Sequence, residues 1–497
     1  MTNLQKAFSP ETFRQNAHTL VDLLADYLES AENQALTTVI PYQEPDDALA
    51  FWQADYEQDD RNVIDFFKKT IEKSTHLHHP RYMGHQVTPP LPITAMAGML
   101  TGMLNNGMAV YEMGLVSNPL ERILSEILAK RIGFDMNASG LLTSGGTLAN
   151  LTALLAARAY KTEVWEEGNV GNLGVMVSEE AHYCIDRAAR IMGMGSDGII
   201  KIPTNDRLQI RTDLLEKYYI EATEKGIRII AIVGSACSTS TGSYDNLEEI
   251  GVFAQKHSIW FHVDAAHGGA VIFSEKYKHK VKGIEQADSV IIDWHKMLMT
   301  PALATALIFR RDEDAFKTFQ QKAQYLWANQ DSKDWFNSGK RTFECTKLMM
   351  SVKIYAILKA HGEAIFTENV EYLYDLGQKF AEMVKSRPNF ELAIEPESNI
   401  VCFRRTPPPT PPQKGGAFSP SLLGRGGATD ASEGFLNNFN SSIRKQLLHD
   451  GKFYIVQTSL KENVYLRVSL MNPLTTENDL NALLDEVENI GNTLAGK

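Results

Sequence analysis

The chain has 497 residues, of which 43% are hydrophobic, and its 49 basic and 61 acidic side chains give a net charge of −12. This length and composition predict a globular protein with one large domain and smaller attachments. The acidic balance and the lack of a basic patch argue against nucleic acid as a partner and favour a small-molecule ligand.

The four cysteines are far apart and show no CxxC spacing, so the sequence predicts neither a disulfide framework nor a zinc site. We therefore expect a reducing compartment. No apolar signal core follows Met1, and the longest apolar run, ITAMAGMLTGML, is short and broken by glycine. We expect no membrane segment and a cytoplasmic protein.

The first predicted element is an amphipathic helix, with Ser9 as its N-cap and Pro10 as its first residue. Its apolar stripe includes Phe13, Val21 and Leu24. The stripe could be buried within its own domain or against a partner subunit. Residues 1–80 are predicted to form an N-terminal helical segment that packs in a dimer.

The stretch HLHHPRYMGH, residues 76–85, contains four histidines, which raises the possibility of a metal site. The spacing does not match a helical ligand pair, and no cysteine or paired carboxylate lies beside it. We therefore expect no metal, and favour a loop in which His85 lines a pocket.

Residues 92–132 are predicted to be helical, and the run TSGGTLANL then places two glycines before another helix. Leu148, Leu151, Leu154 and Leu155 are expected to form the buried stripe of that helix. A small-residue turn that opens a helix presents free backbone N–H groups and the positive end of the helix dipole. The turn is thus a candidate anion site, although the same pattern also occurs in simple tight turns. The residues concerned are Ser144, Gly145, Gly146 and Thr147.

Residues 174–309 alternate between apolar strands and amphipathic helices, which predicts an α/β fold with a mostly parallel central sheet. Ligands of such folds bind at the carboxyl ends of the strands. His182, Thr239, Asp264 and Lys296 each follow a predicted strand. We expect these four side chains to lie near one another.

Lys296 follows the apolar strand SVIID directly. A single lysine is usually a solvated surface charge, but an amine held away from water loses its proton more easily and can condense with a carbonyl group. Its position after a buried strand favours a lysine that forms a Schiff base.

Two further segments are distinctive. Residues 310–341 are polar but contain several aromatic side chains, so they are a candidate mobile loop over the pocket, with packing against a neighbour as the alternative. Residues 360–497 are predicted to form a smaller α+β domain. Within it, the Pro- and Gly-rich residues 406–434 are predicted to be a disordered insertion, followed by a helix from Phe435.

The runs HPRYMGH, TSGGTLANL, SEEAHYCIDRA, STGSYDNLEEIG, WFHVDAAHGG, DWHKMLM and LRVSLMNP together resemble the group II pyridoxal-phosphate-dependent amino-acid decarboxylases. This family includes the glutamate, cysteine-sulfinate, diaminobutyrate and aromatic-amino-acid decarboxylases. The resemblance implies pyridoxal 5'-phosphate as cofactor and a fold of the aspartate-aminotransferase type, known as fold type I. It also implies a homodimer, with residues 81–359 as the large cofactor-binding domain.

The resemblance also implies roles for individual residues. Lys296 is similar to the lysine that binds the cofactor as a Schiff base, Asp264 to the partner of the pyridine nitrogen, and His182 to the histidine stacked on the ring. Further contacts with the cofactor are implied for Ser144, Gly145, Gly146, Thr147, Thr239, Ala266 and His295. Arg467 is similar to the arginine that holds a substrate carboxylate, and His85 is a second candidate for substrate binding.

The implied activity is decarboxylation of an L-amino acid to an amine and carbon dioxide. A related enzyme with another outcome, such as an aldehyde synthase, a transaminase or another lyase, is the alternative, because the family's loop tyrosine has no clear counterpart here beyond Tyr325. Where glutamate decarboxylases carry a polar pair, this chain has His85 and Val87. Glutamate is therefore not favoured as the substrate. A binding protein descended from such an enzyme is a further alternative.

Overall fold

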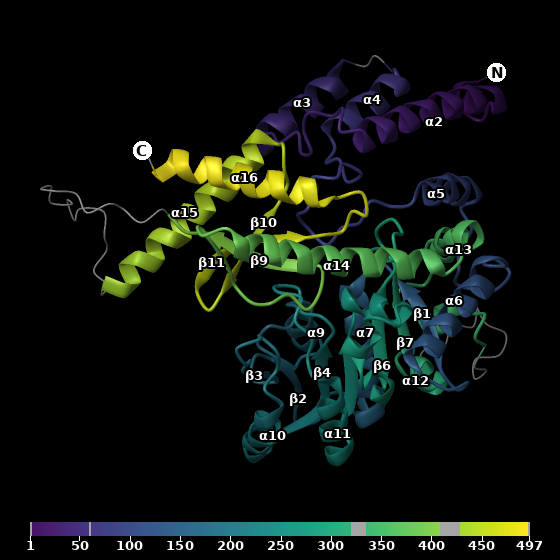
Figure 1. The fold of residues 1–497 in the computed structure, drawn as a ribbon. Helices are drawn as coiled ribbons and strands as arrows, with labels where there is room; N and C mark the ends of the chain where they lie inside the picture. Colours follow the sequence, from purple (N-terminus) through teal and green to yellow (C-terminus); the bar gives the residue numbers. More distant parts are fainter. Residues whose placement is uncertain (1, 59–60, 320–333, 408–427, 496–497) are drawn as a thin grey trace, which may run out of the picture. The chain divides into compact units, whose positions relative to one another are not determined.

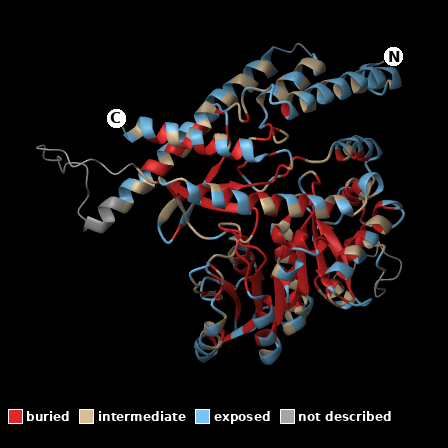
Figure 2. Ribbon diagram, viewed as in Figure 1, coloured by how far each residue is buried: buried red, intermediate tan, exposed pale blue. Residues whose placement is uncertain are grey.

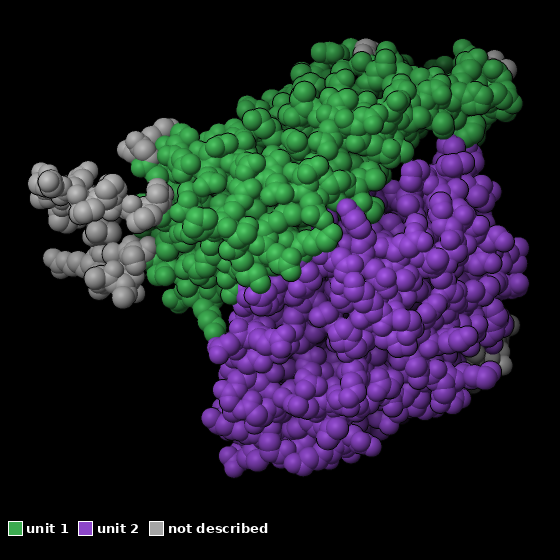
Figure 3. All heavy atoms as spheres, viewed as in Figure 1, with its two compact units in different colours: residues 1–85, 379–393, 402–497 green, residues 86–378, 394–401 purple. Residues whose placement is uncertain are grey.

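The structure is a computed structural model that describes residues 2–58, 61–319, 334–407 and 428–495. The chain divides into two compact units (Figure 3). Unit 1 comprises residues 1–85, 379–393 and 402–497, and unit 2 comprises residues 86–378 and 394–401. The predicted N-terminal segment thus falls into the same unit as most of the C-terminal residues.

Unit 2 is built on a seven-stranded sheet with the strand order β1-β7-β6-β5-β4-β2-β3 (Figure 1). The pairs from β6 through β5, β4 and β2 to β3 are parallel, whereas β7 runs antiparallel to both β1 and β6. This confirms the predicted α/β fold with a mostly parallel sheet. The strands are β1 (Ser139–Thr143), β2 (Asn172–Ser178), β3 (Ile199–Ile202), β4 (Ile227–Ser235), β5 (Trp260–Asp264), β6 (Ser289–Asp293) and β7 (Thr305–Phe309).

The central strands are buried along almost their whole length (Figure 2), as expected for a parallel sheet whose two faces are both covered. The helices and 3-10 helices of unit 2 precede, connect or follow these strands. These are α5 (Pro92–Leu104), α6 (Ser117–Ile132), α7 (Gly146–Lys161), α8 (Val164–Glu167), α9 (Cys184–Ile191), η1 (Thr212–Leu214), α10 (Leu215–Glu224), α11 (Leu247–His257), η2 (Gly268–Phe273), η3 (Lys278–Val281), η4 (Ile284–Gln286), α12 (Asp312–Lys317), η5 (Ser338–Lys340) and α13 (Met350–His361). Helix α14 (Ala364–Ser386) begins in unit 2 and ends in unit 1.

Helix α7 packs closely on the sheet through small side chains, which differs from the predicted leucine stripe. Ala149, Ala153, Ala156 and Ala157 are fully buried in the core, and of the four predicted leucines only Leu154 is. The other three are partly exposed, and Leu151 and Leu155 pack against the edge of the same core.

The predicted helical region 92–132 is two helices, α5 and α6. Asn105 ends α5 in a left-handed conformation with φ of 47°, and the chain continues without helix up to Ser117. Asparagine adopts this conformation more readily than most residues, so it is a common helix terminator.

Unit 1 contains the N-terminal helices and, apart from the first two residues of β9, a four-stranded sheet with the order β10-β11-β9-β8. Ser9 caps α2 by accepting a hydrogen bond from the Thr12 backbone N–H, as predicted.

Helix α15 begins at Ala428, within the range predicted as the insertion, and residues 408–427 lie outside the described part. The elements are α1 (Asn3–Ala7), α2 (Pro10–Glu32), α3 (Pro45–Glu57), α4 (Val63–Lys73), β8 (Phe390–Leu392), β9 (Ile400–Arg405), α15 (Ala428–Asp450), β10 (Val456–Leu460), β11 (Asn463–Ser469) and α16 (Glu477–Ala495). In the described residues, no helix is both long enough and apolar enough to cross a bilayer.

Candidate functional site

A cavity of about 420 Å³ lies in unit 2, at the carboxyl ends of strands β1, β2, β4, β5 and β6. The ten residues that the sequence predicted as cofactor contacts all line it. They are Ser144, Gly145, Gly146, Thr147, His182, Thr239, Asp264, Ala266, His295 and Lys296. Residues separated by up to 152 positions in the chain are thus brought to one place, because parallel strands end at the same edge of the sheet.

The N-terminus of α7 opens onto this cavity. Gly145 precedes the helix with φ of 118°, a conformation that favours glycine, and no described side chain caps the helix. The first backbone N–H groups of α7 are therefore available to an anion. The Ser144 hydroxyl, beside the turn, donates a hydrogen bond to Glu344 at 3.0 Å.

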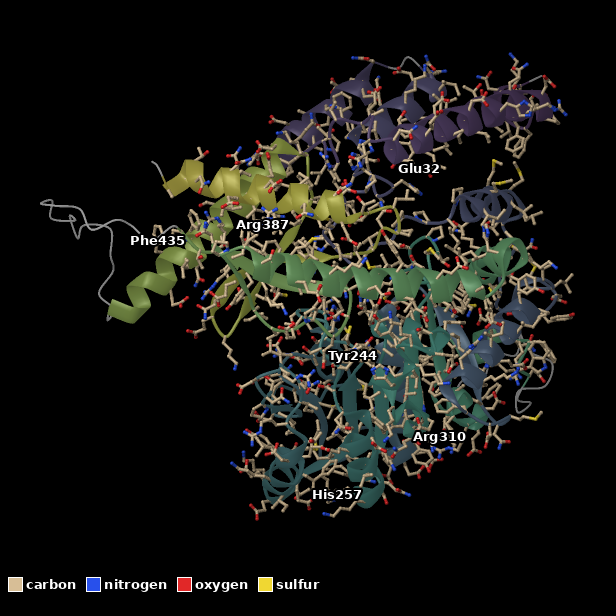
Figure 4. All side chains as sticks on the ribbon, viewed as in Figure 1. Glu32, Tyr244, His257, Arg310, Arg387 and Phe435 are labelled. Atoms are coloured by element: carbon tan, nitrogen blue, oxygen red, sulfur yellow. The ribbon has the colours of Figure 1, made fainter. Side chains whose placement is uncertain are left out.

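Asp264 ends β5 and is half-buried, with its carboxylate held by two donors. The Asn150 side-chain amide donates to Oδ2 at 3.0 Å, and the Ala266 backbone N–H donates to Oδ1 at 3.2 Å. Four residues after Asp264, the Gly268 carbonyl accepts a hydrogen bond of 3.1 Å from the hydroxyl of Tyr244, which is labelled in Figure 4. A Cβ at Gly268 would lie 2.3 Å from the Tyr244 hydroxyl, so this close approach requires glycine.

Lys296 forms an ion pair with Asp293, a residue that was not among the predicted site residues. The Lys296 Nζ lies 2.9 Å from Asp293 Oδ2, and His295 Nε2 lies 3.6 Å from the same oxygen. The Thr305 hydroxyl donates to the other carboxylate oxygen. Asp293 is therefore a fully buried carboxylate whose two oxygens both have partners.

The charge of Asp293 changes the expected behaviour of the amine. Burial lowers the pKa of Lys296, but the carboxylates of Asp293 and Asp264 raise it by more, so the pKa lies above its usual value. The pKa of Asp293 is lowered in turn, because the nearby cations outweigh the effect of burial. The prediction that scarce water would make this amine lose its proton more easily was wrong, because it left out the counter-ion.

His182 is half-buried at the cavity wall. Burial lowers its pKa, and the positive charge of Lys296 adds to this effect, while Asp264 and Asp293 oppose it. Its Nδ1 accepts a hydrogen bond of 3.4 Å from the Cys184 backbone N–H. An imidazole in this environment is uncharged at neutral pH.

Several residues that line the cavity were not predicted from the sequence. Asn150, Cys184, Arg187, Cys237 and Asp293 belong to it. Asn150 lies one helical turn after Gly146, and Asp293 lies three residues before Lys296, so both could have been found from their spacing to residues already identified.

His85 and Arg467 both belong to unit 1. Burial lowers the pKa of His85, and the positive charges of Arg467 and Arg444 lower it further. His85 and Arg444 also line a cavity of about 640 Å³ in unit 1, together with Lys445 and His449.

Residues 320–333 of the predicted mobile loop, including Tyr325, lie outside the described residues.

Comparison with known proteins gives a consistent result. The profile of the pyridoxal-dependent decarboxylase conserved domain matches residues 45–406. The chain is 31% identical to an aspartate 1-decarboxylase of Aliivibrio fischeri over 85% of this chain and 81% of the relative. It is 25% identical to an aromatic-L-amino-acid decarboxylase of Bacillus atrophaeus over 98% of this chain and 96% of the relative.

The fold is shared with solved structures of low sequence identity. The crystal structure of mouse CSAD superposes with a TM-score of 0.86 at 24% identity, covering 97% of this chain and 99% of that one. The structure of Oryza sativa TDC with PLP and tryptamine superposes with a TM-score of 0.83 at 19% identity, covering 98% and 99%.

Proposed function

Because the chain belongs to the pyridoxal-dependent decarboxylase family, with pyridoxal phosphate as its cofactor, we propose that it converts an L-amino acid to the corresponding amine and carbon dioxide. The observation that carries this proposal is the convergence of Lys296, Asp264 and His182 on one cavity. We assign the cofactor to that cavity and its covalent attachment to Lys296.

The donor set of the cavity fits the cofactor. A phosphate monoester suits the uncapped N-terminus of α7, and an aldehyde suits the primary amine of Lys296. A protonated pyridine nitrogen requires a carboxylate partner, which Asp264 provides with its orientation already set by two hydrogen bonds. The small side chain of Ala266 leaves room for a flat ring beside it.

When bound, pyridoxal phosphate supplies a conjugated ring that accepts the electron pair released as the bond to the carboxylate breaks. Enzymes lower barriers by roughly 8–23 kcal/mol, whereas one charge-assisted hydrogen bond contributes about 1.5–3 kcal/mol. The side chains of the cavity therefore act by positioning and by holding protons.

Three residues share that work in our proposal. Asp264 holds a proton at the pyridine nitrogen through its negative charge. His182 presents an uncharged aromatic surface to the cavity, because its pKa is lowered. Asp293 accepts a hydrogen bond from the Lys296 amine, which would give that amine a defined place whenever it is not bonded to the cofactor.

We assign binding of a substrate carboxylate to Arg467, with His85 as a second contact. The positive charges of Arg467 and Arg444 that act on His85 support an anionic ligand in this part of unit 1. Replacing Arg467 with methionine, which keeps much of its length, is expected to raise KM for the amino acid. If KM stays the same while the variant still folds, this assignment is wrong.

We also propose that the protein is a homodimer, with α5 in the interface. Large apolar side chains are exposed along residues 96–116 of the single chain. They are Met96, Met99, Leu100, Met103, Leu104, Tyr111, Met113, Leu115 and Val116. An exposed apolar patch of this extent favours contact with a second copy of the chain. Phe13, Val21 and Leu24 of α2 are exposed as well, which supports a part for that helix.

The test of the function is a panel of L-amino acids assayed for released carbon dioxide and amine. The panel should contain aspartate, glutamate, cysteine sulfinate, 2,4-diaminobutyrate, tyrosine and DOPA. One substrate should give carbon dioxide and an equal amount of amine, and Lys296→Ala should give neither. Peroxide and ammonia in place of the amine would instead indicate an aldehyde synthase, and no turnover of any amino acid would contradict the proposal.

A further inference from the structure

Asp264 stands at the end of a line of buried hydrogen bonds that leads away from the cavity into the core of unit 2. We propose that this line is a one-way relay that orients Asp264 and supplies its carboxylate with a fixed N–H donor. Its members are Trp260, Ser289, His262 and Asn150. The inference rests on the proposed function, because it gives these four residues a positioning role towards the carboxylate that serves the cofactor.

The four contacts are all of ordinary hydrogen-bond length. The Trp260 indole N–H lies 2.9 Å from Ser289 Oγ, and Ser289 Oγ lies 2.8 Å from His262 Nδ1. The other ring nitrogen, His262 Nε2, lies 2.8 Å from Asn150 Oδ1. The Asn150 amide nitrogen completes the line, 3.0 Å from Asp264 Oδ2.

The direction of the relay is set by the charge of Asp264, because the Ser289 hydroxyl can accept from Trp260 in either direction. An indole N–H can only donate, and an ionised carboxylate can only accept. The Ser289 hydroxyl accepts from Trp260 and donates to His262 Nδ1. His262 then carries its proton on Nε2 and donates it to the Asn150 carbonyl oxygen, which leaves the Asn150 amide to donate to Asp264. Every donor points towards the carboxylate.

The opposite direction is possible only if Asp264 is neutral. With its proton on Nδ1, His262 could donate to the Ser289 main-chain carbonyl, 3.2 Å away. Nε2 would then accept, and the Asn150 side chain would have to turn over. Its carbonyl oxygen would face Asp264 Oδ2, which requires a proton between the two oxygens. The donor pattern and the charge of Asp264 are therefore linked.

Burial gives the relay its strength. Trp260, His262 and Ser289 are fully buried, and Asn150 is 1% exposed, so water does not replace a lost partner. Burial also lowers the pKa of His262 to about 4, so the ring is neutral at physiological pH and has one donor and one acceptor nitrogen. The second Asn150 amide proton is directed at Cys184 Sγ, 3.2 Å away, which further fixes the amide orientation.

The backbone explains how these residues meet. Trp260, His262 and Asp264 alternate along β5 and so lie on the same face of the sheet. The parallel register pairs His262 with Ser289 on β6. Asn150 comes from α7, the helix whose N-terminus opens onto the cavity. The relay thus joins the helix of the anion site to the strand that carries Asp264.

Neutron diffraction from crystals of the cofactor-loaded wild-type protein tests the relay without any substitution. The result expected is a deuteron on His262 Nε2 and none on Nδ1, with both Asn150 amide deuterons directed at Asp264 and Cys184. A deuteron on Nδ1, with the Asn150 carbonyl oxygen towards Asp264, would overturn the inference.

A matched pair of variants tests whether the relay matters for catalysis. Glutamine can place an amide N–H near the position of Nε2, whereas asparagine reaches only the position of Nδ1. His262→Gln should therefore keep most of kcat, and His262→Asn should lower kcat by about 10–100-fold with a smaller change in KM, as is typical when a residue that orients a catalytic group is lost.

Thermal stability and a Ser289→Ala variant distinguish a positioning role from a merely structural one. If both variants lose activity only in proportion to their loss of thermal stability, the residues are structural and the inference fails. If neither folds, Ser289→Ala removes a single hydroxyl and should still lower kcat. A protein that releases carbon dioxide but carries the deuteron on Nδ1 would refute the relay alone, whereas absence of turnover in the wild type would refute the proposed function.

Discussion

At the scale of single residues, the Lys296–Asp293 pair determines how the amine can react. An amine attacks an aldehyde only in its unprotonated form, yet the nearby carboxylates hold the pKa of Lys296 above its usual value. The same charge keeps the buried amine paired and in a fixed position, with Nζ 2.9 Å from Asp293. The ion pair with Asp293 therefore fixes the position of the Lys296 amine, but it also lowers the fraction of that amine that is unprotonated and reactive.

Replacing Asp293 with asparagine tests this account. The Asp293→Asn substitution would keep a polar partner for the amine but remove the negative charge, so the pKa of Lys296 should fall. The pH dependence of the reaction between the cofactor-free protein and pyridoxal phosphate, followed by absorbance, should move to lower pH by about 1–3 units. A pH dependence that stays the same, or moves to higher pH, would show that Asp293 does not control the amine.

His262 makes the stability of the protein depend on pH. Its pKa is about 4 in the folded protein, against 6.5 ordinarily. Below pH 6.5 the unfolded chain takes up a proton that the folded chain does not, so stability falls as pH is lowered towards 4. The loss attributable to this residue is about 3 kcal/mol at pH 4. Above pH 6.5 it contributes no pH dependence.

Urea unfolding at several pH values checks this prediction. His262→Gln should be less stable than the wild type at pH 7 but should lose about 3 kcal/mol less between pH 6.5 and 4. The other buried histidines are present in both proteins, so the difference isolates His262. Parallel curves for the two proteins would mean that His262 does not stay neutral in the fold.

At the scale of elements, the start of α7 couples backbone conformation to anion binding. Gly145 has φ of 118°, and a Cβ there would come no closer than 3.5 Å to Leu303. There is room for a methyl group, so any cost of substitution comes from the backbone. The conformation directs the first N–H groups of the helix at the cavity, so in our proposal this one glycine helps to hold the cofactor phosphate.

Gly145→Ala should lower the free energy of unfolding by about 1–3 kcal/mol and weaken cofactor binding. Gly434→Ala is the control, because Gly434 lies in α15 with no atom near its added Cβ. That substitution should be stabilising by about 0.5–1 kcal/mol through helix propensity. Chemical unfolding and equilibrium titration with pyridoxal phosphate measure both effects. If the two variants behave alike, the positive φ of Gly145 is not needed.

At the scale of the whole molecule, the exposure of the apolar face of α5 is not explained by any packing within the described part of the single chain. Leu100 and Met103 lie on that face, one turn apart. Changing both to glutamate should convert a dimer to monomers in sedimentation velocity. Val252→Glu, which alters an exposed apolar residue of α11, should leave the mass unchanged. A monomeric wild type, or a doubly substituted protein that stays dimeric, would contradict the proposed interface.

Much of the candidate site could be predicted from the sequence because its residues follow the strands of an alternating strand–helix pattern. Strand periodicity locates the ends of β2, β4, β5 and β6, and the topology of a parallel sheet brings those ends together. The Gly-Gly turn before an apolar helix likewise indicates an anion site. In each case a local signal in the sequence corresponds directly to a place in the fold.

The electrostatic details could not be predicted in the same way. Sequence spacing makes Asp293 a candidate, but whether it pairs with Lys296 depends on how the chain turns after β6, and this pairing reversed the expected direction of the pKa shift of Lys296. The alternation of Trp260, His262 and Asp264 was visible in the sequence, but the register that places Ser289 beside His262 was not. Both the ion pair of Lys296 and the neighbourhood of His262 depend on contacts between elements, which the sequence alone does not give.

Every residue role proposed for the cavity depends on a covalent bond between Lys296 and the cofactor. The most direct measurement is to load the purified protein with pyridoxal phosphate, reduce it with borohydride, digest it and identify the modified peptide by mass spectrometry. We predict a single major site of modification, at Lys296, which disappears in Lys296→Ala. Modification at a different lysine, or none after unbound cofactor is removed, would show that Lys296 does not carry the cofactor.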